Sequence, residues 1–177
     1  MLGQNRITLT SLKIAEFASE ETTCFEAKLR FDGKIIGTAQ NDGKGGCTLL
    51  YPVAGKKQDF EAAKKYAESL PALEIGLPDD KGAKIPLVMD LELLVDELVI
   101  EKNRQKKIRA KFKRDFPKKI MFVRDGKVFS INGIELRTEN DKAIAYQQVR
   151  KINGKNIVIL SELPEDEAFE LYVKAMQ

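Results

Sequence analysis

The N-terminal third of the chain alternates apolar and polar residues, as half-buried β-strands do. The clearest case is 24–31, in which every second residue from Phe25 is apolar and the residues between are charged. Less regular strands are predicted at 7–17, 34–40 and 47–51. Asp32-Gly33 suits a type I′ hairpin turn, because both residues tolerate a positive φ. These segments predict an antiparallel sheet.

Helical spacing of apolar residues follows. Residues 58–70 form the first predicted helix, which Pro71 ends. Residues 71–86 contain three prolines and two glycines and are predicted as a loop. The helical pattern of 87–116 is about 45 Å long at 1.5 Å per residue, so we expect a break near Asn103.

The C-terminal third mixes both patterns. Its predicted elements are a hairpin around Asp125-Gly126, a helix at 139–151, a strand at 157–160 and a helix after Pro164. The predicted fold class is α+β: an N-terminal antiparallel sheet with helices, a long basic helix, and a small C-terminal αβ unit. The expected division is 1–86 and 87–177, either as two parts or as one continuous domain.

The composition narrows the chemistry. Among 177 residues there are two Cys and no His, which excludes a Ser-His-Asp triad, a Cys-His dyad and a His metal ligand. Two cysteines alone cannot complete a structural zinc site. We therefore expect a protein that is not an enzyme and that has no metal or other cofactor.

The N-terminus has no apolar core of signal-peptide length, and no apolar run approaches the ~18 residues of a membrane span. We therefore expect a cytoplasmic protein that does not enter a membrane. In that compartment Cys24 and Cys47 are expected to be reduced.

Several short motifs suggest a relationship. The stretch 17–25, Asp32-Gly33-Lys34, the loop 41–46 and Met89-Asp90-Leu91-Glu92 together resemble an uncharacterised group of small bacterial and phage-encoded proteins. The resemblance covers about residues 7–99. The group often has His where this chain has Lys44. No activity is established for the group, and the resemblance implies only a phage or mobile-element setting. In that setting the protein could be an interaction module, for example one that inhibits a host defence component.

The glycine-rich loop is one candidate binding site. Its spacing departs from a P-loop, and Gly45 stands where the hydroxyl residue belongs. Its backbone amides could still hold an anion such as the phosphate of a nucleotide or cyclic nucleotide, at Asp42, Gly43, Lys44, Gly45 and Gly46. Alternatively, the glycines only allow a flexible connection. Nothing in the spacing brings together the turn carboxylates, which are Glu20, Glu21, Asp32 and Asp42.

The distribution of charge is the strongest signal. The net charge is +3, yet residues 102–137 hold 13 Lys/Arg and three Asp/Glu. Ten cations are candidate nucleic-acid contacts: Lys102, Arg104, Lys106, Lys107, Arg109, Lys111, Lys113, Arg114, Lys118 and Lys119. Ile108, Phe112 and Phe116 form a narrow apolar stripe that can seat the helix.

Four interpretations of this segment compete. The favoured one is contact with nucleic-acid phosphates, with little sequence readout because no base-stacking or zinc-finger motif is present. The others are a docking surface for an acidic protein, a solvated face that pairs at most with the acidic N-terminal half of this chain, and a membrane-surface helix.

Overall fold

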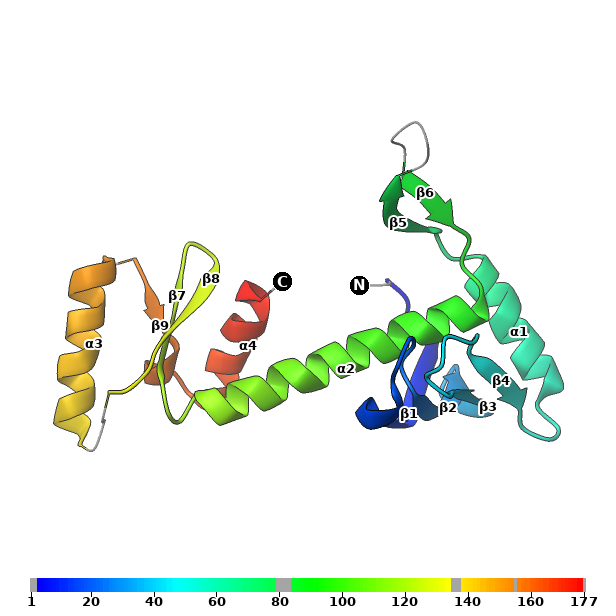
Figure 1. The fold of residues 1–177 in the computed structure, drawn as a ribbon, viewed down its shortest axis with the longest axis horizontal. Helices are drawn as coiled ribbons and strands as arrows, with labels where there is room; N and C mark the ends of the chain where they lie inside the picture. Colours follow the sequence, from blue (N-terminus) through cyan, green and yellow to red (C-terminus); the bar gives the residue numbers. More distant parts are fainter. Residues whose placement is uncertain (1–2, 79–83, 135–137, 155, 177) are drawn as a thin grey trace. The chain divides into compact units, whose positions relative to one another are not determined.

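The computed structural model describes residues 3–78, 84–134, 138–154 and 156–176. The chain forms two compact units, Met1–Asn103 and Arg104–Gln177. Their boundary lies inside helix α2 (Leu91–Asp115), whereas the sequence predicted a division at 86/87, before this helix begins. The fold class is α+β, as predicted (Figure 1).

The first unit contains a four-stranded antiparallel sheet in the order β1-β2-β3-β4. Its strands are β1 (Ile7–Ile14), β2 (Phe25–Phe31), β3 (Lys34–Asn41) and β4 (Leu49–Pro52). A short 3-10 turn, η1 (Glu16–Ala18), replaces the end of the first predicted strand. Asp32 and Gly33 both have a positive φ, which confirms the predicted hairpin turn.

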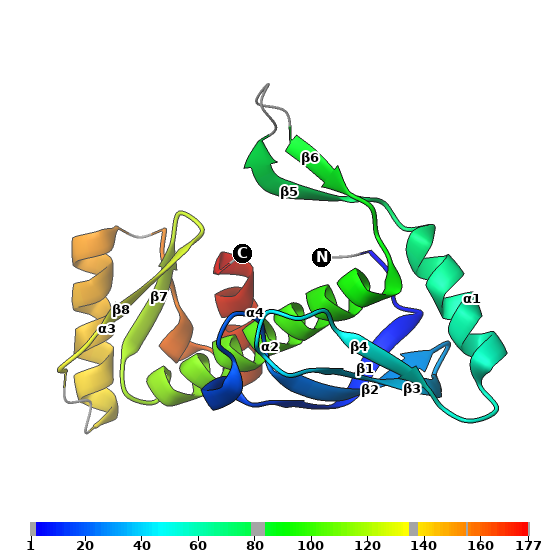
Figure 2. The ribbon, with the colours of Figure 1, turned by 45° about the vertical axis from the view of Figure 1, so that its right-hand side comes forward.

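The core of the first unit lies on one face of this sheet. The alternating residues of β2 point into it, and Leu29 is fully buried. Helix α1 (Lys57–Glu68) contributes Phe60 to this core, and the first half of α2 contributes Leu94 and Val95. Figure 2 shows both helices beside the sheet. This contact explains why the compact unit extends into α2.

The predicted loop at 71–86 is wrong within the described residues. Strands β5 (Leu73–Pro78) and β6 (Lys84–Leu87) form a two-stranded antiparallel hairpin, and the rest of that prediction, 79–83, lies outside the description. The prolines misled the prediction. Proline removes one backbone donor, but both strands of a two-stranded ladder are edges, where a missing donor is tolerated.

Helix α2 differs from its prediction in two respects. It begins at Leu91 because the Asp90 side chain caps it, accepting a hydrogen bond of 2.7 Å from the amide of Leu93. It also continues to Asp115 without the expected break near Asn103. No Gly or Pro interrupts this stretch, and apolar residues at both of its ends are buried in packed cores.

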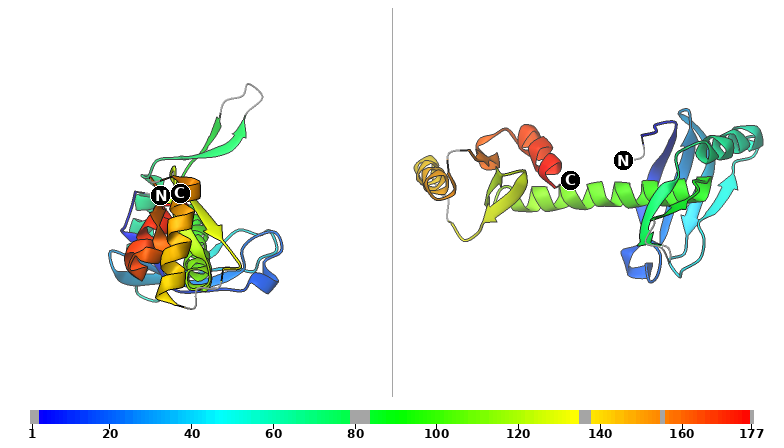
Figure 3. Two further views of the ribbon diagram at one scale, coloured as in Figure 1. Left: turned by 90° about the vertical axis from the view of Figure 1, so that its left-hand side faces the viewer. Right: turned by 90° about the horizontal axis from the view of Figure 1, so that it is seen from above.

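The second unit places a three-stranded sheet, in the order β8-β7-β9, between helices. The elements that follow α2 are β7 (Ile120–Arg124), β8 (Lys127–Ile131), α3 (Glu139–Asn153), β9 (Val158–Ile159), η2 (Leu160–Glu162) and α4 (Glu165–Ala175). Ile120 and Phe122 pack with α3, whereas Met121 packs with Phe112 of α2 and Tyr172 of α4. Figure 3 shows α4 beside the C-terminal part of α2.

Candidate functional site

The predicted apolar stripe packs the basic half of α2, which runs from Lys102 to Asp115, against the second unit's core. Phe112 is 1% exposed, and Ile108 and Phe116 are half-buried in the same cluster. The ring of Phe112 stacks on that of Phe116 with centroids 4.7 Å apart, and it also contacts Phe169 and Tyr172 of α4. The opposite side of the helix is thereby turned outward.

Most of the ten candidate cations are exposed at the surface. Arg104 and Lys119 are half-buried, and the other eight have exposed side chains: Lys102, Lys106, Lys107, Arg109, Lys111, Lys113, Arg114 and Lys118. Eight of the ten cations lie on α2, and Lys118 and Lys119 lie in the turn between α2 and β7.

Two of the cations are paired with the carboxylate of Asp115, the last residue of α2. Asp115 is buried, and its carboxylate lies 3.0 Å from Nε of Arg114 and 3.2 Å from Nζ of Lys119. The hydrogen bond from Arg114, supported by Lys119, holds the pKa of Asp115 below its usual range. A ligand that recruits Arg114 or Lys119 has to share them with Asp115.

Two more cations lie beside the N-terminal turn of α4. The guanidinium of Arg109 covers the ring of Phe169 at 4.8 Å. Arg109 and Lys113 line a small hollow together with Glu165 and Asp166. Part of the basic helix therefore faces acidic residues of this chain, and these belong to α4 and not to the acidic N-terminal half that the sequence suggested.

Four lysines neither pair with Asp115 nor line the hollow beside α4. Lys102, Lys106, Lys111 and Lys118 are exposed, and no ion pair within 4.0 Å involves them in the described part of the chain. They are the cations that a partner can reach without displacing an internal contact.

The backbone amides of the glycine-rich loop already donate hydrogen bonds to side chains of the protein. The amide of Gly43 donates to Oδ1 of Asn41 at 2.9 Å, that of Lys44 to Oδ1 of Asp42 at 3.1 Å, and that of Gly45 to Oγ1 of Thr22 at 3.3 Å. An anion in this loop would compete with three internal acceptors. The predicted nest is therefore occupied by side chains of the protein.

Two turns that are distant in sequence dock on each other here. The carbonyl of Gly43 accepts hydrogen bonds from the amides of Glu20, Glu21 and Thr22, at 3.0 to 3.2 Å. Gly43 has a φ of +86°, and a Cβ at this position would lie 2.1 Å from the carbonyl oxygen of Ala18. Glycine is required for this close approach. The spacing of the carboxylates gave no sign of it.

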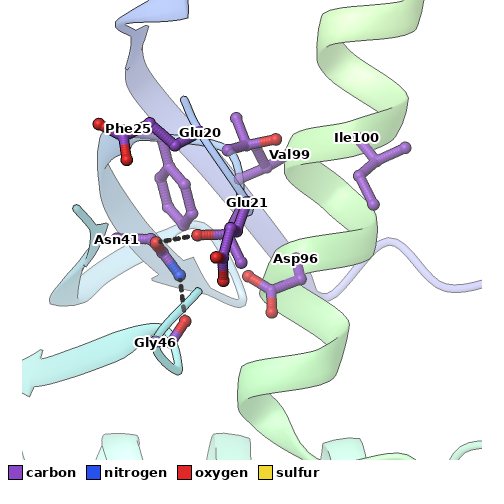
Figure 4. A pocket seen from close by; sticks show the side chains of 10 residues that line it. Glu20, Glu21, Phe25, Asn41, Gly46, Asp96, Val99 and Ile100 are labelled. Carbon is purple, nitrogen blue, oxygen red and sulfur yellow. Dashed lines mark hydrogen bonds between the residues drawn. The ribbon is translucent and has the colours of Figure 1, made fainter. Parts of the chain in front are cut away.

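The docked turns border a hollow of about 340 Å³ in the first unit (Figure 4). Its polar side includes Glu20 and Glu21 of the turn and Asp96 of α2, and its apolar side includes Phe25 and Val99. No ion pair of the described residues involves these three carboxylates. A phosphate would meet repulsion here, which further weighs against anion binding at the adjoining loop.

Asp96 gives the hollow a titratable group. Burial raises its pKa, and the hydrogen bond from the hydroxyl of Thr48 acts against that shift. The ionised form is thus disfavoured in the folded state relative to the unfolded state. The ionised carboxylate of Asp96 therefore lowers the free energy of unfolding at neutral pH. This cost is relieved as the pH falls through the folded-state pKa.

We expect Asp96→Asn to raise the free energy of unfolding at pH 7, because Asn keeps an acceptor for Thr48 without a buried charge. The gain should fade as the pH falls from the raised folded-state pKa toward the unfolded-state value of ~3.9, below which Asp96 is protonated in both states. Urea unfolding at several pH values measures it, with the exposed Glu68→Gln as the control. A pH-independent loss of stability in Asp96→Asn would contradict this account.

Three further observations concern the cysteines, metal binding and membrane helices. Cys24 is half-buried, Cys47 is exposed, and both are free thiols. Within the described residues, no group of three or more His, Cys, Asp or Glu side chains is arranged to hold a metal ion. Of the helices in that part of the chain, none has the length and apolar character needed to cross a membrane.

Comparison with known proteins adds no assignment. No protein-family model, curated protein or solved structure matches this chain.

Proposed function

We propose that this protein binds the phosphate backbone of nucleic acid, without sequence readout, through the basic half of α2. The observation that carries the proposal is the row of exposed cations on a helix whose apolar stripe is fixed in a core. Like charges three or four residues apart repel one another, and a bound polyanion relieves that repulsion.

The chemistry of the segment favours phosphate contact over base readout. Phe112 and Phe116 are the aromatic residues between Lys102 and Lys119, and both are turned toward the core. The exposed side therefore offers no ring for base stacking. Phosphate contacts fix the position of a nucleic acid but carry no sequence information.

Salt dependence tests the proposal directly. We expect fluorescence anisotropy with a short labelled DNA duplex to show binding that weakens steeply between ~50 and ~300 mM salt. If the four accessible lysines each contact a phosphate, the logarithmic slope should be about −3 to −4, since each contact contributes about −0.9. Duplexes of scrambled sequence should bind equally well.

Two outcomes would overturn the proposal. No binding at ~50 mM salt would show that the cations serve another partner, such as an acidic protein. Binding that is insensitive to salt would show that phosphate contacts do not carry the affinity.

A further inference from the structure

The basic half of α2 has two flanks that differ in their surroundings. At 100° per residue, Lys111 and Lys113 fall on opposite sides of the buried Phe112. Lys107 and Arg114 share the side of Lys111, whereas Arg109 and, on earlier turns, Lys102 and Lys106 share the side of Lys113. The two lysines thus have the same charge and both are exposed, but they face different neighbours.

Acidic residues of α4 border the Lys113 flank. Glu165 and Asp166 line the same hollow as Arg109 and Lys113, and both carboxylates are exposed. They belong to the first turn of α4, where the helix dipole favours negative charge. A phosphate that approaches Lys113 therefore also meets two carboxylates, which oppose its binding.

Lys111, by contrast, does not line the hollow with Glu165 and Asp166, and it forms no ion pair among the residues that the structure describes. Lys107, Lys111 and Arg114 follow one another along about two helical turns. Asp115 also lies on this side, but its carboxylate is buried and paired with Arg114 and Lys119. Its charge is already compensated within the protein.

We propose that, where α2 passes α4, the nucleic-acid backbone runs along the Lys111 flank, and that the acidic turn of α4 keeps it away from Arg109 and Lys113. This inference rests on the proposed function and assigns an orientation to it. The acidic turn then limits the size of the phosphate-binding surface, because it competes with the ligand for Arg109 and Lys113.

The matched pair Lys111→Gln and Lys113→Gln tests the orientation. Both variants lose one exposed charge on the same stretch of the same helix. We expect Lys111→Gln to lower the affinity for a DNA duplex about 5- to 10-fold and to reduce the salt slope by about one. Lys113→Gln should change the affinity less than about twofold.

Removing the acidic turn tests the cause. In a background carrying Glu165→Gln and Asp166→Asn, the affinity should rise, and Lys113→Gln should now lower it as Lys111→Gln does. Glu170→Gln, an exposed position further along α4, is the control and should leave the affinity and its dependence on Lys113 nearly unchanged.

The outcomes separate the two proposals. Equal losses for Lys111→Gln and Lys113→Gln in the otherwise unaltered protein would overturn the orientation but leave phosphate binding in place. An unaltered protein that shows no salt-dependent binding would overturn the proposed function itself.

Discussion

Replacing Lys106, Lys111 and Lys118 by Glu is expected to lower the affinity for nucleic acid by at least about 100-fold at ~100 mM salt. Under the proposed function, each substitution removes a phosphate contact and adds a repulsive charge. The variant should fold normally, because the three side chains are exposed and form no ion pair in the described part of the protein. Fluorescence anisotropy with a labelled DNA duplex measures the loss, and circular dichroism checks the fold.

The control for this prediction changes the same total charge elsewhere. Lys28, Lys57 and Lys65 are exposed lysines of the first unit, and replacing all three by Glu changes the net charge equally. We expect this control to reduce the affinity far less, through the weak long-range field alone. Equal losses in the two triple variants would mean that overall charge, and not the basic half of α2, governs binding.

Phe112→Ala should destabilise the second unit by about 3 to 5 kcal/mol, as deletion of a fully buried aromatic ring does. Phe112 joins α2 to α4 through ring contacts with Phe169 and Tyr172, with both pairs of centroids 5.2 Å apart. The loss is a large share of the stability of an ordinary domain. Urea unfolding followed by amide NMR signals should show it in the second unit, while the first unit unfolds nearly as before.

The same substitution at Phe17 provides the control. Phe17 is 95% exposed on η1, so Phe17→Ala removes no buried contact and should change the free energy of unfolding by at most about 0.5 kcal/mol. A loss at Phe112 no larger than that at Phe17 would contradict the view that the stripe of α2 seats the basic helix.

Local patterns predicted much of the fold because they depend on residues that are close in sequence. The alternation at 24–31 became β2, and the dipeptides at 32–33 and 125–126 became turns with positive φ. The stripe that includes Phe112 was also predicted and is buried. The buried faces of β2 and α2 follow from a short repeat of apolar residues, and the turns follow from single dipeptides, so the sequence displays both directly.

Predictions that required longer-range information were less successful. The hairpin of β5 and β6 was missed, because pairing between strands compensates for the prolines that usually mark a loop. Likewise, the sequence did not bring Glu20 or Glu21 near Asp96. Their position around one hollow depends on Gly43 docking against the turn before β2, and no periodicity in the sequence records that docking.

The sequence by itself determined that one helix carries an excess of cations and that its apolar stripe faces a core. Only the tertiary structure decided which of these cations a partner can reach. That decision depends on α4, whose residues lie about 50 positions further along the chain, and on the burial of Asp115 between Arg114 and Lys119. Charge is a property of each residue alone, whereas its availability depends on which other charges the fold places beside it.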